Sequence, residues 1–125
     1  MKLFTIVSSA LMLASSASAL GINCRGSSNC AGTLCNLSQL IAQAAQLPDN
    51  NQYFPGQHIV CCGSSGSPGG ICAFTQNTSQ NISGRRVKEL LQGLSNHGCG
   101  KCGSNPFERN DVQFGQLTVN FVSQR

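Results

Sequence analysis

The stretch NHGCGKCG, residues 96–103, combines residue types that could do chemistry. His97 lies two residues before Cys99, and Cys99 and Cys102 form a C-x-x-C pair. Such a group is found in three settings: half of a zinc site, a thiol–disulfide redox centre, or two cysteines that belong to separate structural disulfides. The choice among these depends on the rest of the chain.

The zinc and redox interpretations both meet an obstacle. Zinc takes four protein ligands in a structural site, whereas His97, Cys99 and Cys102 supply three and the sequence has no second C-x-x-C. A redox pair gains from a helix N-terminus, where the helix dipole lowers the thiol pKa. Here the pair follows Gly98, where we expect a helix to end. The pattern therefore favours two disulfide halves, and we predict neither a metal nor a cofactor.

The first nineteen residues are typical of a secretory signal peptide. Lys2 is followed by the short apolar run LFTIVSSALMLA and by small residues that end in Ala-Ser-Ala at position 19. We predict cleavage after Ala19, which leaves residues 20–125 as a single extracellular domain. The apolar run is shorter than a membrane span, and no later stretch approaches one.

Every cysteine of the chain falls after the predicted leader. There are eight, an even number, at positions 24, 30, 35, 61, 62, 72, 99 and 102. A small secreted domain buries a limited core and commonly depends on disulfides, so we predict four bridges.

The charge pattern argues against nucleic acid as a partner. Without Lys2, seven basic residues face four acidic ones, a net charge of about +3, and they are scattered. Arg85, Arg86 and Lys88 form the one local cluster, which is more typical of a solvated helix turn than of a binding patch. We also expect no small-molecule substrate and a monomeric protein.

Two segments have helical periodicity. In residues 35–50, Leu37, Leu40, Ile41, Ala44 and Leu47 recur at helical spacing, and Pro48 ends the pattern. In residues 83–98, apolar residues form one stripe from Val87 to Leu94, with Ser83 as the expected N-cap and Gly98 as the expected C-cap.

Short apolar or alternating runs predict strands around these helices. They are GINC (21–24), HIVCC (58–62), GICAFT (70–75) and FGQLTVNFV (114–122), while GSNPFERND (103–111) is expected to be irregular. The order β-α-β-β-α-β predicts an α+β fold, an α/β sandwich on the split β-α-β plan. In this fold two helices pack on one face of an antiparallel sheet.

Three N-x-S/T sequences are candidate glycosylation sites in a secreted chain. They begin at Asn36, Asn77 and Asn81. The last two lie between a predicted strand and a predicted helix and are better placed than Asn36, which is next to Cys35. Unmodified polar loop residues remain an equal alternative.

Several stretches together resemble the killer protein four toxin family, which includes killer toxins of a smut-fungus virus and fungal relatives. They are LGINCRGSSNC after the predicted cleavage site, NISG, LSNHGCGKCGSNP and NDVQFGQLTVNFV. The resemblance implies a secreted, non-enzymatic α/β sandwich that acts on a membrane protein of susceptible cells. It further implies inhibition by blocking voltage-gated calcium channels.

The resemblance also implies disulfide pairs. Cys24–Cys99 and Cys30–Cys102 would join the N-terminal strand to the turn after the second helix. The remaining cysteines, at 35, 61, 62 and 72, would then pair among themselves. Neighbours on a strand point to opposite faces, so Cys61 and Cys62 should have different partners. We favour Cys35–Cys61 with Cys62–Cys72.

One position departs from the family in a way that bears on function. Family activity is attributed to a basic residue before the second strand's cysteine, where this chain has Val60 in GQHIVCCG. A channel blocker typically presents a cation to a carboxylate-lined pore. The candidate target contacts are then Lys101, Arg25 and, when protonated, His58.

Two other function classes compete with a toxin. A hydrophobin-like surface protein would share the leader, the size and eight cysteines, but it has two Cys-Cys doublets where this chain has one. Foam or interface assembly would distinguish it. For an enzyme the acid–base candidates are few and unmatched, and G-x-S-x-G and H-E-x-x-H are both missing from the sequence. These candidates are His58, His97, Asp49, Glu89, Glu108 and Asp111.

Overall fold

The computed structural model describes residues 21–125, so the predicted leader and its cleavage site lie outside the described residues. The main sheet is antiparallel with strand order β2-β3-β6-β5, and a second antiparallel sheet pairs β1 with β4. The main strands are β2 (Val60–Cys62), β3 (Gly70–Gln76), β5 (Gly103–Pro106) and β6 (Gln116–Val122). The small sheet contains β1 (Gln52–Tyr53) and β4 (Ile82–Ser83).

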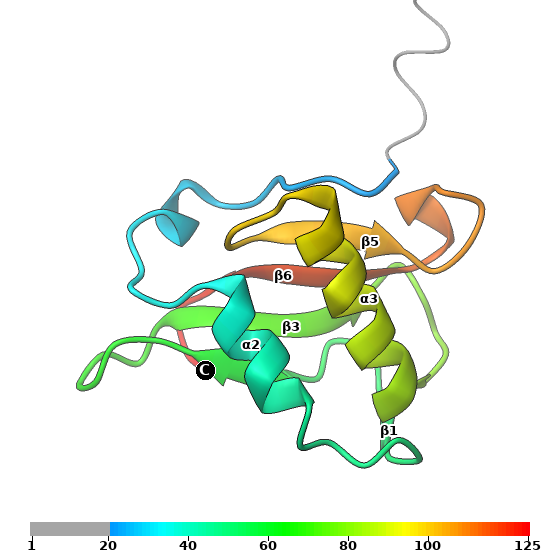
Figure 1. Ribbon diagram of the computed structural model, residues 1–125, viewed down its shortest axis with the longest axis horizontal. Coiled ribbons are helices and arrows are strands. Elements are labelled where there is room, and N and C mark those ends of the chain that lie inside the picture. Colours follow the sequence, from blue (N-terminus) through cyan, green and yellow to red (C-terminus); the bar gives the residue numbers. More distant parts are fainter. Residues whose placement is uncertain (1–20) are drawn as a thin grey trace, which may run out of the picture.

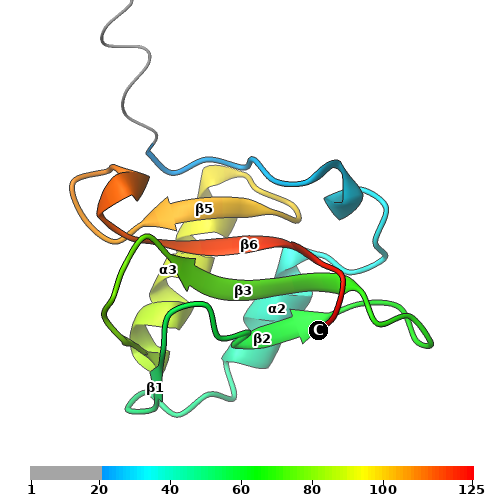
Figure 2. The same cartoon turned by 180° about the vertical axis from the view of Figure 1, so that it is seen from behind.

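The α-helices α2 (Leu37–Ala44) and α3 (Gly84–His97) lie on one face of the main sheet, and no helix of residues 21–125 covers the other face (Figures 1 and 2). β3 and β5 both run antiparallel to β6, which lies between them, so β3, α3 and β5 form a split β-α-β unit. The predicted α+β class with two helices on one face is confirmed.

Helix α3 begins and ends where the sequence predicts, whereas α2 ends at Ala44, before the predicted stop at Pro48. Asn36 caps α2, accepting from the Gln39 backbone N–H, while the Gln39 side chain accepts from the Asn36 backbone N–H. Ser83 caps α3 by accepting from Arg86 N–H. Gly98 ends α3 with φ of 102°, a left-handed conformation that glycine adopts without steric cost.

The core lies between the helices and the inner face of the main sheet. Alternate residues of β3 and β6 point inward, among them Ile71, Leu117 and Val119, each with 0% exposure. The helices contribute Leu37, Leu40, Val87, Leu91 and Leu94 from their apolar stripes.

Two predicted elements are wrong. The N-terminal run GINC forms only an isolated bridge, Asn23 to Ser104, although it follows the edge of β5 (Figure 1). Residues 103–106, expected to be irregular, form β5 because Gly103–Pro106 pairs with β6 along its whole length. The small β1–β4 sheet was also not predicted; each of its strands has two residues, too few for a periodic pattern.

Candidate functional site

Two disulfides fix the N-terminal segment against the end of α3. Cys24 bonds to Cys99 with Cα atoms 5.2 Å apart, and Cys30 bonds to Cys102 with Cα atoms 6.3 Å apart. These are the pairs that the family resemblance implies. Both sulfurs of the C-x-x-C motif are thus oxidised, and each goes to a different cysteine. His97 is exposed in the last turn of α3.

The predicted pairing of the other four cysteines is wrong. The bridges are Cys35–Cys62 and Cys61–Cys72, with Cα atoms 5.7 Å and 4.1 Å apart. Cys61 and Cys72 are directly opposite each other in the β2–β3 ladder, so their side chains share one face. Cys62 points to the other face, where the start of α2 brings Cys35 within reach. The expectation that the neighbours take different partners is confirmed.

His58 lies beside the Cys61–Cys72 bridge. Its ring and the sulfurs of these two cysteines come within 4.8 Å of one another, a grouping that could bind a metal ion if the thiols were free. The two sulfurs bond to each other, which removes the thiolate ligands. The exposed His58 ring also lies 5.8 Å from the Phe74 ring, centroid to centroid. The His58 side chain is accessible to a partner.

Lys101, the first candidate target contact, forms hydrogen bonds within the chain. Its ammonium donates to the backbone carbonyls of Thr33, at 2.5 Å, and Ala31, at 3.3 Å. The residue is half-buried, and its side chain holds the loop before α2 against the C-x-x-C turn. To contact a partner, the ammonium would have to give up these hydrogen bonds.

Arg25 differs from every other cation that the structure describes. Between residues 21 and 125, the other six basic side chains all have a partner: a carboxylate for Arg85, Arg86, Lys88 and Arg109, and backbone carbonyls for Lys101 and Arg125. In the same range the exposed Arg25 side chain forms neither a hydrogen bond nor an ion pair. Its guanidinium is therefore free to bind an anionic group.

The backbone around Arg25 is held firmly although its side chain is free. Arg25 N–H donates to Asn23 Oδ1 at 3.0 Å. Ser27 N–H donates to Asn120 Oδ1 at 2.9 Å, which ties the segment to β6. Gly26 approaches so closely that a Cβ there would stand 2.7 Å from the Cys102 Cβ. A held backbone reduces the entropy lost on binding through Arg25.

Asn120 is a positioning residue that the sequence did not reveal. The sequence shows only that Asn120 lies within the predicted strand at residues 114–122. In the structure its carboxamide oxygen accepts from both Ser27 N–H and Phe121 N–H, at 2.9 Å and 2.8 Å. No local pattern could have shown this, because Ser27 lies 93 residues away along the chain.

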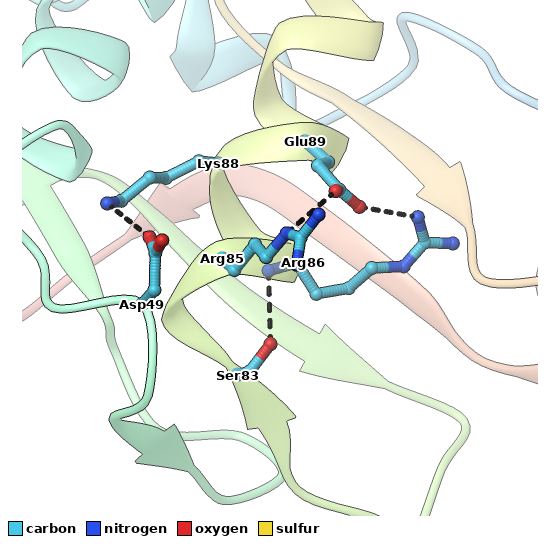
Figure 3. Close-up of polar contacts among 6 residues, drawn as sticks. All are labelled: Asp49, Ser83, Arg85, Arg86, Lys88 and Glu89. Carbon is cyan, nitrogen blue, oxygen red and sulfur yellow. Dashed lines mark hydrogen bonds and ion pairs between the residues drawn. The ribbon is translucent and has the colours of Figure 1, made fainter.

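The basic cluster at the start of α3 is largely neutralised (Figure 3). Arg86 and Arg85 approach Glu89 at 3.1 Å and 3.6 Å, and Lys88 donates to Asp49 at 2.9 Å. The hydrogen bond from Lys88 and its charge hold the pKa of the Asp49 carboxyl below its ordinary value of 3.8. These contacts fit the interpretation of the cluster as a solvated helix turn.

A basic side chain at position 60 would be buried in the core. Val60 is 7% exposed and lies on the face of β2 that points toward the helices. Val60→Lys would bury an ammonium group without a counter-charge, so we expect the free energy of unfolding to fall by roughly 3–5 kcal/mol. Urea unfolding followed by circular dichroism measures this loss.

The exposed His58 provides the matched control for that substitution. His58→Lys introduces the same side chain two residues away on the surface, and we expect it to change stability by less than about 1 kcal/mol. Equal losses in the two variants would contradict the inward placement of Val60.

Comparison with known proteins relates this chain to killer toxins. The family model described as Kp4 matches residues 7–123. The KP4 killer toxin of Ustilago maydis P4 virus is 43% identical over 106 residues, which cover 83% of this chain and 81% of the viral protein.

Proposed function

Because the chain belongs to the Kp4 family, we propose that it is a secreted killer-toxin-like inhibitor that acts from outside on a membrane protein of susceptible cells. The finer proposal is that this membrane protein is a voltage-gated calcium channel, which the inhibitor blocks by presenting a cation to an acidic ring at the pore. Such an inhibitor needs a rigid binding surface and one cationic side chain that is exposed to solvent.

The paired cysteines and the predicted leader support an extracellular inhibitor. All eight cysteines are paired, as expected in an oxidising compartment. No helix between residues 21 and 125 is long and apolar enough to span a membrane. The leader predicted at residues 1–19 would route the chain to secretion.

The acidic groups support a non-enzymatic mode of action. Within residues 21–125 each carboxylate is engaged in a structural contact: Asp49 with Lys88, Glu89 with two arginines, Glu108 with Arg109, and Asp111 with the Gln113 backbone N–H. An acid–base pair for catalysis would need a histidine or carboxylate facing a substrate within hydrogen-bond reach. We therefore propose inhibition by binding alone.

The observation that carries the proposal is the free guanidinium of Arg25 on a disulfide-held segment. An arginine binds a carboxylate through two parallel N–H···O bonds, which a ring of pore carboxylates would accept. Arg25 thus takes the role that the buried Val60 cannot fill. His58, exposed on the helix-free side of the main sheet, is a weaker candidate because it is cationic only when protonated.

Growth inhibition with and without added calcium tests the proposal. We expect the purified chain, without its leader, to slow growth of susceptible fungal cells or plant roots, and extra calcium to relieve the effect by competing for the pore carboxylates. A matched culture receives the same protein after reduction of its disulfides. Inhibition that calcium leaves unchanged would refute the channel target, and no inhibition of any cell tested would refute the toxin proposal.

A further inference from the structure

The three N-x-S/T sequences occupy different structural environments. Asn36 caps α2: its side-chain oxygen accepts from Gln39 N–H at 3.2 Å and from the Ser38 hydroxyl at 2.6 Å. Its backbone N–H donates to the Gln39 side chain at 2.9 Å. The asparagine and the serine of this sequon are thus both part of the first helical turn, next to the Cys35–Cys62 bridge.

The Asn77 side chain is held by a hydrogen bond to a distant segment of the chain. Its side-chain nitrogen, the atom that a glycan would occupy, donates to Val112 C=O at 3.2 Å. The residue has φ of 58°, a left-handed conformation at the end of β3. The Thr78 hydroxyl accepts from Gln80 N–H at 3.0 Å. The hydrogen bond to Val112 C=O and the left-handed backbone fix the orientation of this amide, so a sugar on its nitrogen would lie close to the segment that contains Val112.

Asn81 differs from both. It is exposed, and within residues 21–125 its side-chain amide forms no hydrogen bond. It directly precedes β4, where Ile82 is 5% exposed and points inward. Side chains alternate along an extended segment, so Asn81 and Ser83 point to the side opposite Ile82. The half-buried Ser83 hydroxyl caps α3 by accepting from Arg86 N–H at 3.1 Å, but the asparagine amide itself is accessible.

The surface beside Asn81 has room for a sugar. A cleft of about 440 Å³ is lined by Asn81 together with Gln52, Ser83, Arg86 and Phe107. This lining combines an aromatic ring with amide and guanidinium groups, which suits the apolar and polar faces of a sugar ring. The Arg86 guanidinium is held there by a hydrogen bond to Phe107 C=O at 2.9 Å.

We propose that Asn81 is the N-glycosylation site of this chain and that the cleft beside it contacts the first sugar. The inference rests on the proposed secretion, because the modifying enzyme acts in the secretory pathway. The donor is a lipid-diphosphate-linked oligosaccharide. The Asn81 side-chain nitrogen bonds to C1 of the first sugar, the C1–O bond to the lipid diphosphate breaks, the diphosphate leaves as an anion, and the nitrogen loses one proton.

The modified residue lies far from the proposed target contact. Asn81 precedes the start of α3, whereas the Cys24–Cys99 bridge places Arg25 at the end of that helix (Figure 1). A helix of 14 residues spans about 21 Å, so the sugar attached to Asn81 lies well away from Arg25. The glycan instead shields the basic cluster at the start of α3.

Expression of the full chain with its leader in a yeast secretory host tests the assignment. Medium and cell extract are both analysed by mass spectrometry before and after digestion with peptide N-glycosidase, and the mass lost on digestion reports the glycan. We expect one glycan per chain, absent in Asn81→Gln and retained in Asn36→Gln and Asn77→Gln. Ser83→Thr keeps both the sequon hydroxyl and the α3 cap, so it should retain the glycan.

The outcomes separate this assignment from the toxin proposal. A chain without glycan, or one that keeps its glycan in Asn81→Gln, overturns the assignment even if the protein inhibits growth. A chain with its glycan on Asn81 that inhibits no cell leaves the assignment standing and overturns the toxin proposal. Asn81→Gln should inhibit growth within about twofold of the parent, because Arg25 is unchanged.

Discussion

Removal of both N-terminal bridges should lower the free energy of unfolding by roughly 7 kcal/mol, more than twice the loss from removing either one. The loops of the two bridges overlap almost completely: Cys24–Cys99 and Cys30–Cys102 join residues 75 and 72 positions apart. Either bridge alone closes the long loop, a contribution of about 4 kcal/mol in the chain-entropy model. The second then closes only a ring of about ten residues, which adds about 2.7 kcal/mol.

Single-bridge variants should therefore lose about 2.7 kcal/mol each, and the four-alanine variant should lose more than their sum. Guanidinium unfolding of Cys24→Ala/Cys99→Ala, Cys30→Ala/Cys102→Ala and the combined variant measures the coupling. A loss of 7 kcal/mol is comparable to the whole stability of a small domain, so the combined variant should be unfolded or nearly so.

The Cys61–Cys72 bridge is the matched control. It closes 11 residues within one hairpin, a short loop that stays closed to the same extent whether or not either N-terminal bridge is present. Its removal should cost about 3 kcal/mol and add to the loss from either single N-terminal bridge. If the four-alanine variant lost no more than the sum of the two single-bridge variants, the account of two bridges that share one long loop would be wrong.

The helices and the long strands could be predicted because their patterns are local. The apolar stripe of α3, its Ser83 cap and its Gly98 end all lie within sixteen consecutive residues. Residues 103–106, in contrast, have no strand pattern of their own; they are extended because β6 offers them a partner. Sequence periodicity does not report a short strand that is extended because of its pairing with distant segments, here β6 and Asn23.

The cysteine pairing shows the same limit at the level of single residues. Alternation along a strand correctly predicts that Cys61 and Cys62 face opposite ways. Which of them faces Cys72 depends on the β2–β3 register, and a shift by one residue would exchange the two. The seven-residue loop 63–69 between the strands has no short-turn motif that sets this register.

Only long-range hydrogen bonds distinguish the two candidate target contacts, Lys101 and Arg25. Arg25 follows Cys24 and Lys101 precedes Cys102, and these cysteines belong to the two N-terminal bridges. Both cations lie in polar, glycine-rich sequence. The structure distinguishes them because the carbonyls that bind Lys101 belong to residues about seventy positions away. The spacing of residues within a motif does not show which distant segments will bury a polar group. The sequence alone therefore could not rank the two residues as target contacts.

Arg25→Gln should raise the concentration needed for half-maximal growth inhibition by about 10- to 100-fold. A charge-assisted hydrogen bond contributes roughly 1.5–3 kcal/mol, and each 1.4 kcal/mol is a factor of ten in binding. Because the Arg25 side chain has no partner between residues 21 and 125, its removal should leave thermal unfolding unchanged. Dose–response curves on susceptible cells, paired with melting curves, separate lost binding from lost folding.

Arg85→Gln is the control with the same change of charge. Its side chain is 74% exposed at the far end of α3, where the ion pair with Glu89 contributes at most about 1 kcal/mol. We expect it to inhibit growth like the parent chain. Arg25→Lys keeps the charge but not the bidentate geometry, so its potency should fall between those of the parent and Arg25→Gln. If Arg25→Gln kept full potency, or if both Gln variants lost it equally, Arg25 would not be the specific contact, and inhibition would depend on another surface or on net charge.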